Sequence, residues 1–272
     1  MVNTLAVRNW AYVHQMETIA YELADFVEPL FSNTIGFKSH NLLDVLFGIV
    51  SLTENKLNNH HRKTHSFIKT KNYNDTFNKY EQSFPQVLKS EKNQREETWN
   101  LVGKNLKNLK ATFLAHSDYF LTKIFTQSVD EVYNHLRKKI PKKEISNILE
   151  NLSLKFGELS EVNKDYIFLD NPIHSKPFIS LNKDKYFSII PHMFNHIAID
   201  LLETFLTENT KLKSQYIKKK GKYLEDKVEE LFRKSFPESQ ILAGSLWSNN
   251  IEDKIYENDL IVLIEEFAII VE

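Results

Sequence analysis

The sequence predicts a mostly helical α+β protein. Its 272 residues are 42% hydrophobic and 26% charged, which is enough apolar material for a buried core. Only 6 residues are glycine, well under the usual share of roughly 7%, and this scarcity favours helices. Apolar residues recur at helical spacing through the first two-thirds of the chain, and short β-like runs appear after residue 165.

The composition also excludes several classes of site. There is no cysteine, which rules out disulfides, zinc–thiolate sites, iron–sulfur clusters and a cysteine nucleophile. The formal net charge is −1, so any basic surface must be local. No glycine-rich phosphate loop occurs. The first residues lack the pattern of a signal peptide, and the longest apolar stretch, 42–52, is too short to cross a membrane. We therefore expect a cytoplasmic protein with no membrane segment.

The first 160 residues are expected to be helical with one irregular interruption. Proline residues and the spacing of apolar residues set the boundaries of these segments. In order, we expect a helix ending near Pro29, a buried helix over 42–52 capped from Ser39, loop and irregular helix over 58–94, helix over 99–140 and a short helix over 144–156.

The remainder mixes strands and helices. Residues 166–169 form a β-like run, and the runs 177–181 and 186–190 indicate a hairpin with a four-residue loop. A helix then begins at Pro191. A lysine-rich stretch, Gly221 and an amphipathic helix over 222–235 follow it, and two strands over 260–264 and 267–271 come last. We place the domain boundary between a helical domain, 1–205, and a second domain, 206–272.

Three carboxylates in the second domain are placed as a metal site would place them. Glu225 lies on the predicted helix, Asp259 begins one strand and Glu272 ends the next. If the hairpin is centred between Glu265 and Glu266, partner numbers sum to 531 and Asp259 faces Glu272 on one side of the sheet. Two opposed carboxylates in apolar strands repel each other, and Mg²⁺ or Mn²⁺ would offset that cost. A half-residue shift of the hairpin centre would separate them onto opposite faces.

These segments resemble a known family. Residues 221–231 are similar to the first helix of PD-(D/E)xK nucleases, which have the restriction-endonuclease-like fold. Residues 256–262 resemble the strand that bears the metal-binding aspartate, and 267–272 the next strand, whose E-x-K supplies a metal ligand and a catalytic lysine. The nearest type is the nuclease-related domain. The resemblance covers about residues 221–272.

The resemblance implies Asp259 and Glu272 as metal ligands, with Glu225 assisting from the helix. It also implies that the helix and β-hairpin of 206–272 are the start of a truncated α/β restriction-endonuclease-like domain. The sequence ends at Glu272, so the lysine expected two positions later is absent from it. We therefore expect weak or no catalysis from the chain as given.

Two functions remain open from the sequence. The first is metal-dependent hydrolysis of phosphodiester bonds in nucleic acid, with DNA ahead of RNA, in bacterial defence or repair. The helical domain would then position the nucleic acid or recognise a protein partner. The alternative is a non-catalytic helical module that binds protein or nucleic acid and has a degenerate nuclease-like end.

A basic stretch supports contact with nucleic acid. Residues 208–234 hold nine basic and five acidic residues. Within them Lys218, Lys219, Lys220 and Lys222 are candidates to contact phosphates, although charge runs also occur on exposed helices with no ligand. Tyr216 and Tyr223 are spaced to stack on bases.

A histidine pair is a weaker metal candidate. His192 and His196 are four residues apart, as zinc ligands on a helix can be. They lack the glutamate of an H-E-x-x-H motif. We expect them to be ordinary hydrogen-bonded histidines.

Overall fold

The structure is a computed structural model that describes residues 13–85, 92–161, 171–182, 184–188, 190–249 and 254–271. Two compact units make up the chain, 1–204 and 205–272. The division falls in the last turn of α10 (Phe194–Thr207), one residue before the boundary expected from the sequence. None of the described helices is long and apolar enough to span a bilayer.

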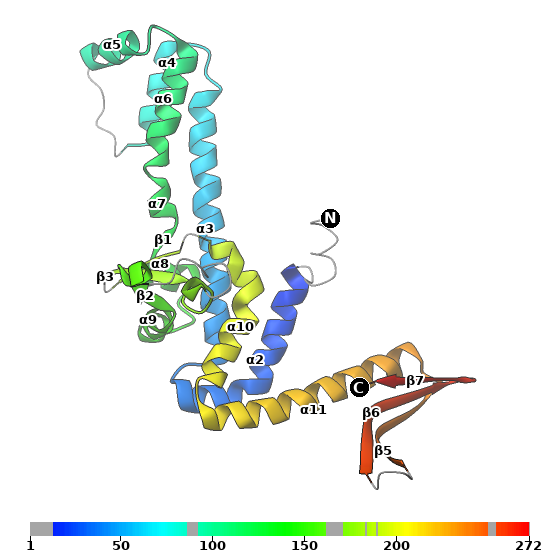
Figure 1. Ribbon diagram of the computed structural model, residues 1–272. Coiled ribbons are helices and arrows are strands. Elements are labelled where there is room, and N and C mark those ends of the chain that lie inside the picture. The colour runs from blue at the N-terminus through cyan, green and yellow to red at the C-terminus, as the bar shows by residue number, and fades with distance from the viewer. Residues whose placement is uncertain are drawn as a thin grey trace. The chain divides into compact units, whose positions relative to one another are not determined.

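The first unit is mostly helical with a small sheet, as the sequence predicts (Figure 1). Its long helices pack side by side through fully buried apolar residues such as Val27, Phe31, Leu42 and Leu46. Its described helices before α10 are α2 (Val13–Ile35), α3 (Ser39–Ile68), α4 (Tyr73–Ser83), α5 (Lys92–Leu101), α6 (Leu106–Asp118), α7 (Leu121–Ile124), α8 (Val129–His135) and α9 (Lys142–Asn151).

Helix α3 is much longer than the predicted helix over 42–52. It continues through residues that the sequence analysis assigned to loop and irregular helix. The buried side of this extension holds Thr53, His60, Thr64 and Phe67, which recur at helical spacing. Three of the four are polar, so hydrophobic periodicity alone did not reveal the helix.

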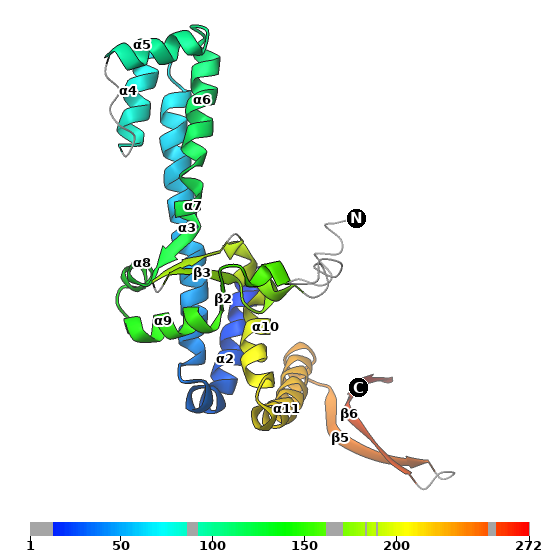
Figure 2. The same cartoon turned by 60° about the vertical axis from the view of Figure 1, so that its left-hand side comes forward.

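Three helices surround the distal end of α3 in Figures 1 and 2, namely α4, α5 and α6. Asparagine side chains cap two of these helices. The side chain of Asn72 accepts a hydrogen bond from a backbone N–H in the first turn of α4, and that of Asn105 accepts hydrogen bonds from backbone N–H groups in the first turn of α6. Their shared core is mainly aromatic. It consists of Phe67, Phe77, Tyr80, Phe84, Leu109 and Phe113. We call the distal end of α3 together with α4, α5 and α6 the distal module.

A four-stranded sheet in the order β1-β4-β3-β2 completes the first unit. The predicted hairpin is confirmed as the antiparallel pair β3 and β4. Its loop is shorter than predicted, because Asn182 pairs with Lys185. The predicted run 166–169 lies outside the described residues. The strands are β1 (Thr126–Ser128), β2 (Ser153–Lys155), β3 (Phe178–Asn182) and β4 (Lys185–Phe187).

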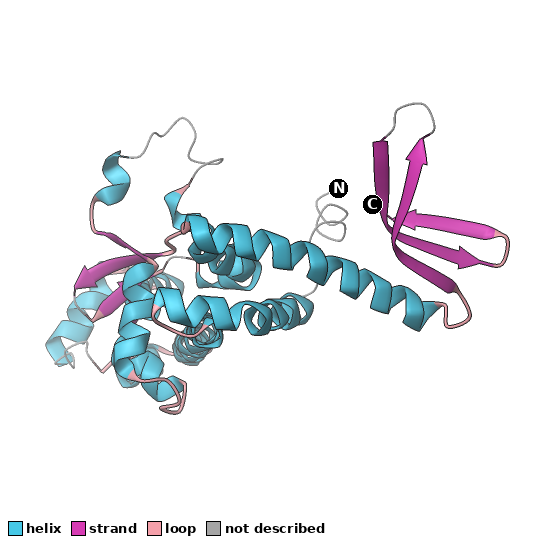
Figure 3. Cartoon of the chain, turned by 90° about the horizontal axis from the view of Figure 1, so that it is seen from below, coloured by secondary structure: helices cyan, strands magenta, loops and turns pink. Residues whose placement is uncertain are grey.

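The second unit is a helix followed by a three-stranded antiparallel sheet (Figure 3). Its helix, α11 (Thr210–Ser235), runs unbroken through Gly221, where the sequence analysis began a new helix. The sheet order is β5-β6-β7, with β5 (Gln240–Asn249), β6 (Lys254–Ile264) and β7 (Phe267–Val271). Strand β5 was not predicted, and β6 begins five residues before the predicted start at Asp259.

Candidate metal and nucleic-acid site

The β6–β7 hairpin has the register expected from the sequence. Leu260 pairs with Val271 and Ile264 with Phe267, so partner numbers sum to 531 throughout the described pairs. The two-residue turn is Glu265-Glu266, and Glu265 has a φ of 51°. This is a left-handed conformation in which glycine or asparagine is usual. The turn is therefore formed despite residues that do not favour it.

Asp259 lies on the exposed face of β6. Its neighbours Asn258 and Leu260 are buried and so is Val262, whose exposed fraction is 0%, while the Asp259 side chain between them is exposed. Successive side chains of a strand point to opposite faces. Helix α11 packs against β5 and β6 within this unit. Asp259 is therefore on the face of the sheet opposite to the buried one.

The residues around Asp259 on this face are mostly apolar. Leu242 pairs with Ile261, and Ile261 pairs with Ile270 on its other side. All three share the face of Asp259, and both Leu242 and Ile270 are exposed. Asp259 is therefore an exposed carboxylate at the edge of an exposed apolar patch.

A glycine opens space beside Asp259. Gly244 lies between Ala243 and Ser245, whose partners Leu260 and Asn258 flank Asp259. Its φ of +58° is disfavoured for residues with a side chain, and an added Cβ would lie 3.3 Å from a carboxylate oxygen of Glu257. The sequence analysis did not single out Glu257, which is exposed and shares the face of Asp259. The signal that could have found it is the two-residue period of the strand, once β6 is extended back to Lys254.

Of the other two predicted carboxylates, the structure describes only Glu225. Glu225 is exposed on α11, whose inward side is marked by the half-buried Val228 and Phe232. Glu272 lies outside the described residues, so its pairing with Asp259 stays a prediction. Within the ranges that the structure describes, no three His, Asp or Glu side chains come close enough to hold a metal ion.

The predicted lysines lie on the first half of α11. Lys218, Lys219 and Lys222 are exposed, while Lys220 is half-exposed and holds its Nζ 5.7 Å from the ring centroid of Tyr216. Residues 210–222 contain six lysines and no acidic residue. This basic segment can attract phosphates through charge alone.

The two predicted stacking tyrosines differ. Tyr216 is buried, with an exposed fraction of 2%, so the expectation that it stacks on bases is wrong. Tyr223 is half-buried, and Nζ of Lys227 lies 5.7 Å from its ring centroid. Base stacking therefore has little support on this helix.

The histidine pair does not share one α-helix. His192 lies in the 3₁₀ turn η4 (Pro191–Met193), and His196 lies in α10. The Nδ1 atom of His192 is 3.6 Å from a carboxylate oxygen of Glu54. Neither histidine belongs to a group of three possible metal ligands among the described residues.

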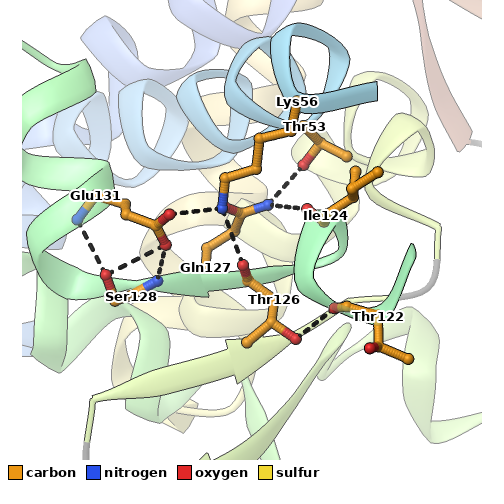
Figure 4. Close-up of polar contacts among 8 residues, drawn as sticks. All are labelled: Thr53, Lys56, Thr122, Ile124, Thr126, Gln127, Ser128 and Glu131. Atoms are coloured by element: carbon orange, nitrogen blue, oxygen red, sulfur yellow. Dashed lines mark hydrogen bonds and ion pairs between the residues drawn. The ribbon is translucent and has the colours of Figure 1, made fainter. Parts of the chain in front are cut away.

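A polar network joins α3 to β1 and α8 in the first unit (Figure 4). Nζ of Lys56 donates to the carbonyl oxygen of Thr126 at 3.1 Å and to Oε1 of Gln127 at 2.6 Å, and it lies 2.8 Å from Oε1 of Glu131. Three acceptors use all three ammonium protons. Burial raises the pKa of the Glu131 carboxyl, but hydrogen bonds from Lys56 and Ser128 outweigh it and leave that pKa lowered. The network is a closed structural link with no donor left for a ligand at Lys56.

Two carboxylates on one face of the sheet are the chemical groups that this part of the structure offers a ligand. Carboxylate oxygens are the ligands Mg²⁺ and Mn²⁺ prefer, and Asp259 and Glu257 offer them on one exposed face. Comparison of the chain with protein-family models, with curated proteins and with solved structures found no match.

Proposed function

We propose that the second unit supports divalent-metal-dependent hydrolysis of phosphodiester bonds in nucleic acid, with DNA preferred over RNA. The observation that carries the proposal is the register of the β6–β7 hairpin, in which Leu260 pairs with Val271. Continued by one residue, this register would pair Asp259 with position 272. The chain order of α11, β6 and β7 also follows the order of the nuclease segments that the sequence resembles. Both features support the proposal independently of the lysines.

The proposal assigns a divalent cation to three carboxylates of the second unit. Asp259 would hold it from β6, Glu272 would be the second ligand and Glu225 would assist from α11. A bound Mg²⁺ or Mn²⁺ would supply Lewis-acid polarisation of the phosphoryl group and a more acidic bound water. Lys218, Lys219 and Lys222 would contact phosphates on either side of the cleaved bond and keep the strand at the sheet.

Metal binding is the most direct test. We would titrate Mn²⁺ into the full chain by isothermal calorimetry, and into Asp259→Asn. Removing one of two predicted ligand carboxylates should weaken binding by about tenfold or more. Glu266→Gln is the matched control, because it removes an acidic charge from the β6–β7 turn and none from the exposed face. Equal Mn²⁺ binding by the wild type and Asp259→Asn would contradict the assignment.

Cleavage is the second test. Labelled duplex DNA, single-stranded DNA and RNA would be incubated with the full chain and Mg²⁺ or Mn²⁺. If the proposal holds, we expect cleavage that chelation of the metal abolishes and that Asp259→Asn lacks. Metal binding at Asp259 with no cleavage of any of the three substrates would favour the alternative, a non-catalytic module.

The basic segment of α11 favours that alternative as a second candidate, because it can bind nucleic acid without a metal. Reversing Lys218, Lys219 and Lys222 to glutamate should weaken DNA retention at about 50 mM salt by tenfold or more and flatten its dependence on salt. The control reverses three exposed lysines of the first unit, Lys139, Lys143 and Lys155. Equal retention by the two triple variants would remove α11 from the interface.

A further inference from the structure

A groove runs along the distal module between the last turn of α3 and α6. These two helices lie side by side in both views (Figures 1 and 2) and are in contact. The groove has a volume of about 430 Å³, within the usual range of ligand-binding clefts. Its lining residues are Ile68, Leu106, Lys107, Lys110, Ala111 and Leu114.

The floor of the groove is aliphatic and accessible. Ile68 is 37% exposed and Leu114 is 40% exposed, and Ala111 between them is also exposed. The adjacent residues Phe67 and Phe113 are buried in the aromatic core, with ring centroids 6.2 Å apart in an edge-to-face arrangement. The groove is therefore formed by helices that the core already fixes, and a ligand would not have to order them.

The rim of the groove carries one sign of charge. Of its six lining residues, Lys107 and Lys110 are basic and none is acidic. Nζ of Lys110 donates to the carbonyl oxygen of Thr70 at 2.6 Å, which fixes one ammonium group across the groove. Lys107 is exposed beside it.

We propose that this groove binds an acidic amphipathic segment of a partner protein. A helix with apolar side chains three or four residues apart would place them on Ile68, Ala111 and Leu114. Carboxylates flanking those side chains would meet the lysine rim, which gives both orientation and faster association. A nucleic acid would meet the rim equally well, but the aliphatic floor offers it neither an aromatic stacking surface nor hydrogen bonds to bases. The combination of floor and rim therefore selects a peptide over a polyphosphate.

Three synthetic helical peptides of equal length separate these contributions. The first has leucines three and four residues apart flanked by glutamates. In the second, lysines replace the glutamates, and in the third, serines replace the leucines. Binding of each labelled peptide to the full chain is measured by fluorescence anisotropy. We expect the first peptide to bind at least about tenfold more tightly than either other peptide, and more weakly as salt rises from about 50 to 500 mM.

Two alanines of α6 provide a matched pair of variants. Ala111 and Ala115 are both exposed, and only Ala111 lines the groove. Ala111→Glu puts a carboxylate on the aliphatic floor and should weaken binding of the first peptide by about tenfold, while Ala115→Glu should leave it within about twofold. Circular dichroism of both variants checks that the helices are intact.

The proposal is overturned by any of three results. The first is equal binding of the three peptides, or none below about 1 mM. The second is equal loss of binding in Ala111→Glu and Ala115→Glu. The third is displacement of the bound peptide by a single-stranded oligonucleotide at comparable concentration, which would assign the lysine rim to nucleic acid.

Discussion

Gln127 is the buried centre of the network that joins α3 to β1, and replacing it tests how much that network contributes. Its exposed fraction is 1%. Its Nε2 donates to Oγ1 of Thr53 at 3.0 Å and to the carbonyl oxygen of Ile124 at 2.7 Å, and its Oε1 accepts from Lys56. Gln127→Met keeps the length of the side chain and removes every one of these hydrogen bonds.

The size of the effect follows from the groups left behind. The hydroxyl of Thr53 can rotate toward a backbone carbonyl of its own helix, so losing the hydrogen bond from Gln127 costs little free energy there. The carbonyl oxygen of Ile124 and one proton of Lys56 lose a partner in a buried setting. Each such group costs about 1–3 kcal/mol. We therefore expect Gln127→Met to lower the free energy of unfolding by about 2–6 kcal/mol, a large part of the total for a domain.

Urea unfolding followed by circular dichroism at 222 nm measures this change, because most helices belong to the first unit. The midpoint should fall by about 1 M or more with little change in slope. Gln82→Met, at an exposed position of α4, is the matched control and should shift the free energy by less than about 0.5 kcal/mol. If Gln127→Met lies as close to the wild type as this control, the network does not hold the helix and sheet together.

Two further predictions use the same measurement. Because the pKa of Glu131 is lowered in the folded state, its ion pair stabilises the fold above pH 4.5 and that contribution is lost as pH falls through the folded pKa. The loss of unfolding free energy in Glu131→Gln relative to wild type should therefore be present at pH 7 and shrink as pH falls through the folded pKa. Gly48→Ala should destabilise by about 1 kcal/mol, because its Cβ would meet Leu136 Cδ2 at 2.7 Å; Gly221→Ala has open space and should stabilise by about 1 kcal/mol.

The parts of the fold that sequence reasoning identified have a clear apolar period. The β3–β4 hairpin and the β6–β7 pairing were found this way, because runs of apolar residues flank a short polar turn in each. The distal half of α3 was missed since its buried side includes Thr53, His60 and Thr64. These polar residues are buried by tertiary packing, which no local pattern predicts.

The unpredicted strand β5 shows a second limit. It contains Gly244 with positive φ and the polar residues Ser245 and Ser248, all of which weaken a strand signal. It pairs with β6 over most of its length, so hydrogen bonds and side-chain contacts with β6 stabilise a strand that its own sequence favours only weakly. Missing β5 also meant missing Gly244, which leaves space on the face of Asp259. The identity of the candidate ligand was predictable from its strand, and its surroundings were not.

At the proposed metal site, the surroundings of Asp259 would couple cation binding to whatever covers the exposed face of the sheet. The carboxylate shares that face with Leu242, Ile261 and Ile270. Any apolar surface laid over these residues removes water from Asp259 and raises the cost of its charge, which a bound cation offsets. Binding free energies are reciprocal, so a cation at Asp259 must favour the covering of the face by the same amount that covering favours the cation. Asp259→Asn removes the charge, and it should therefore weaken metal binding while making the apolar face easier to cover.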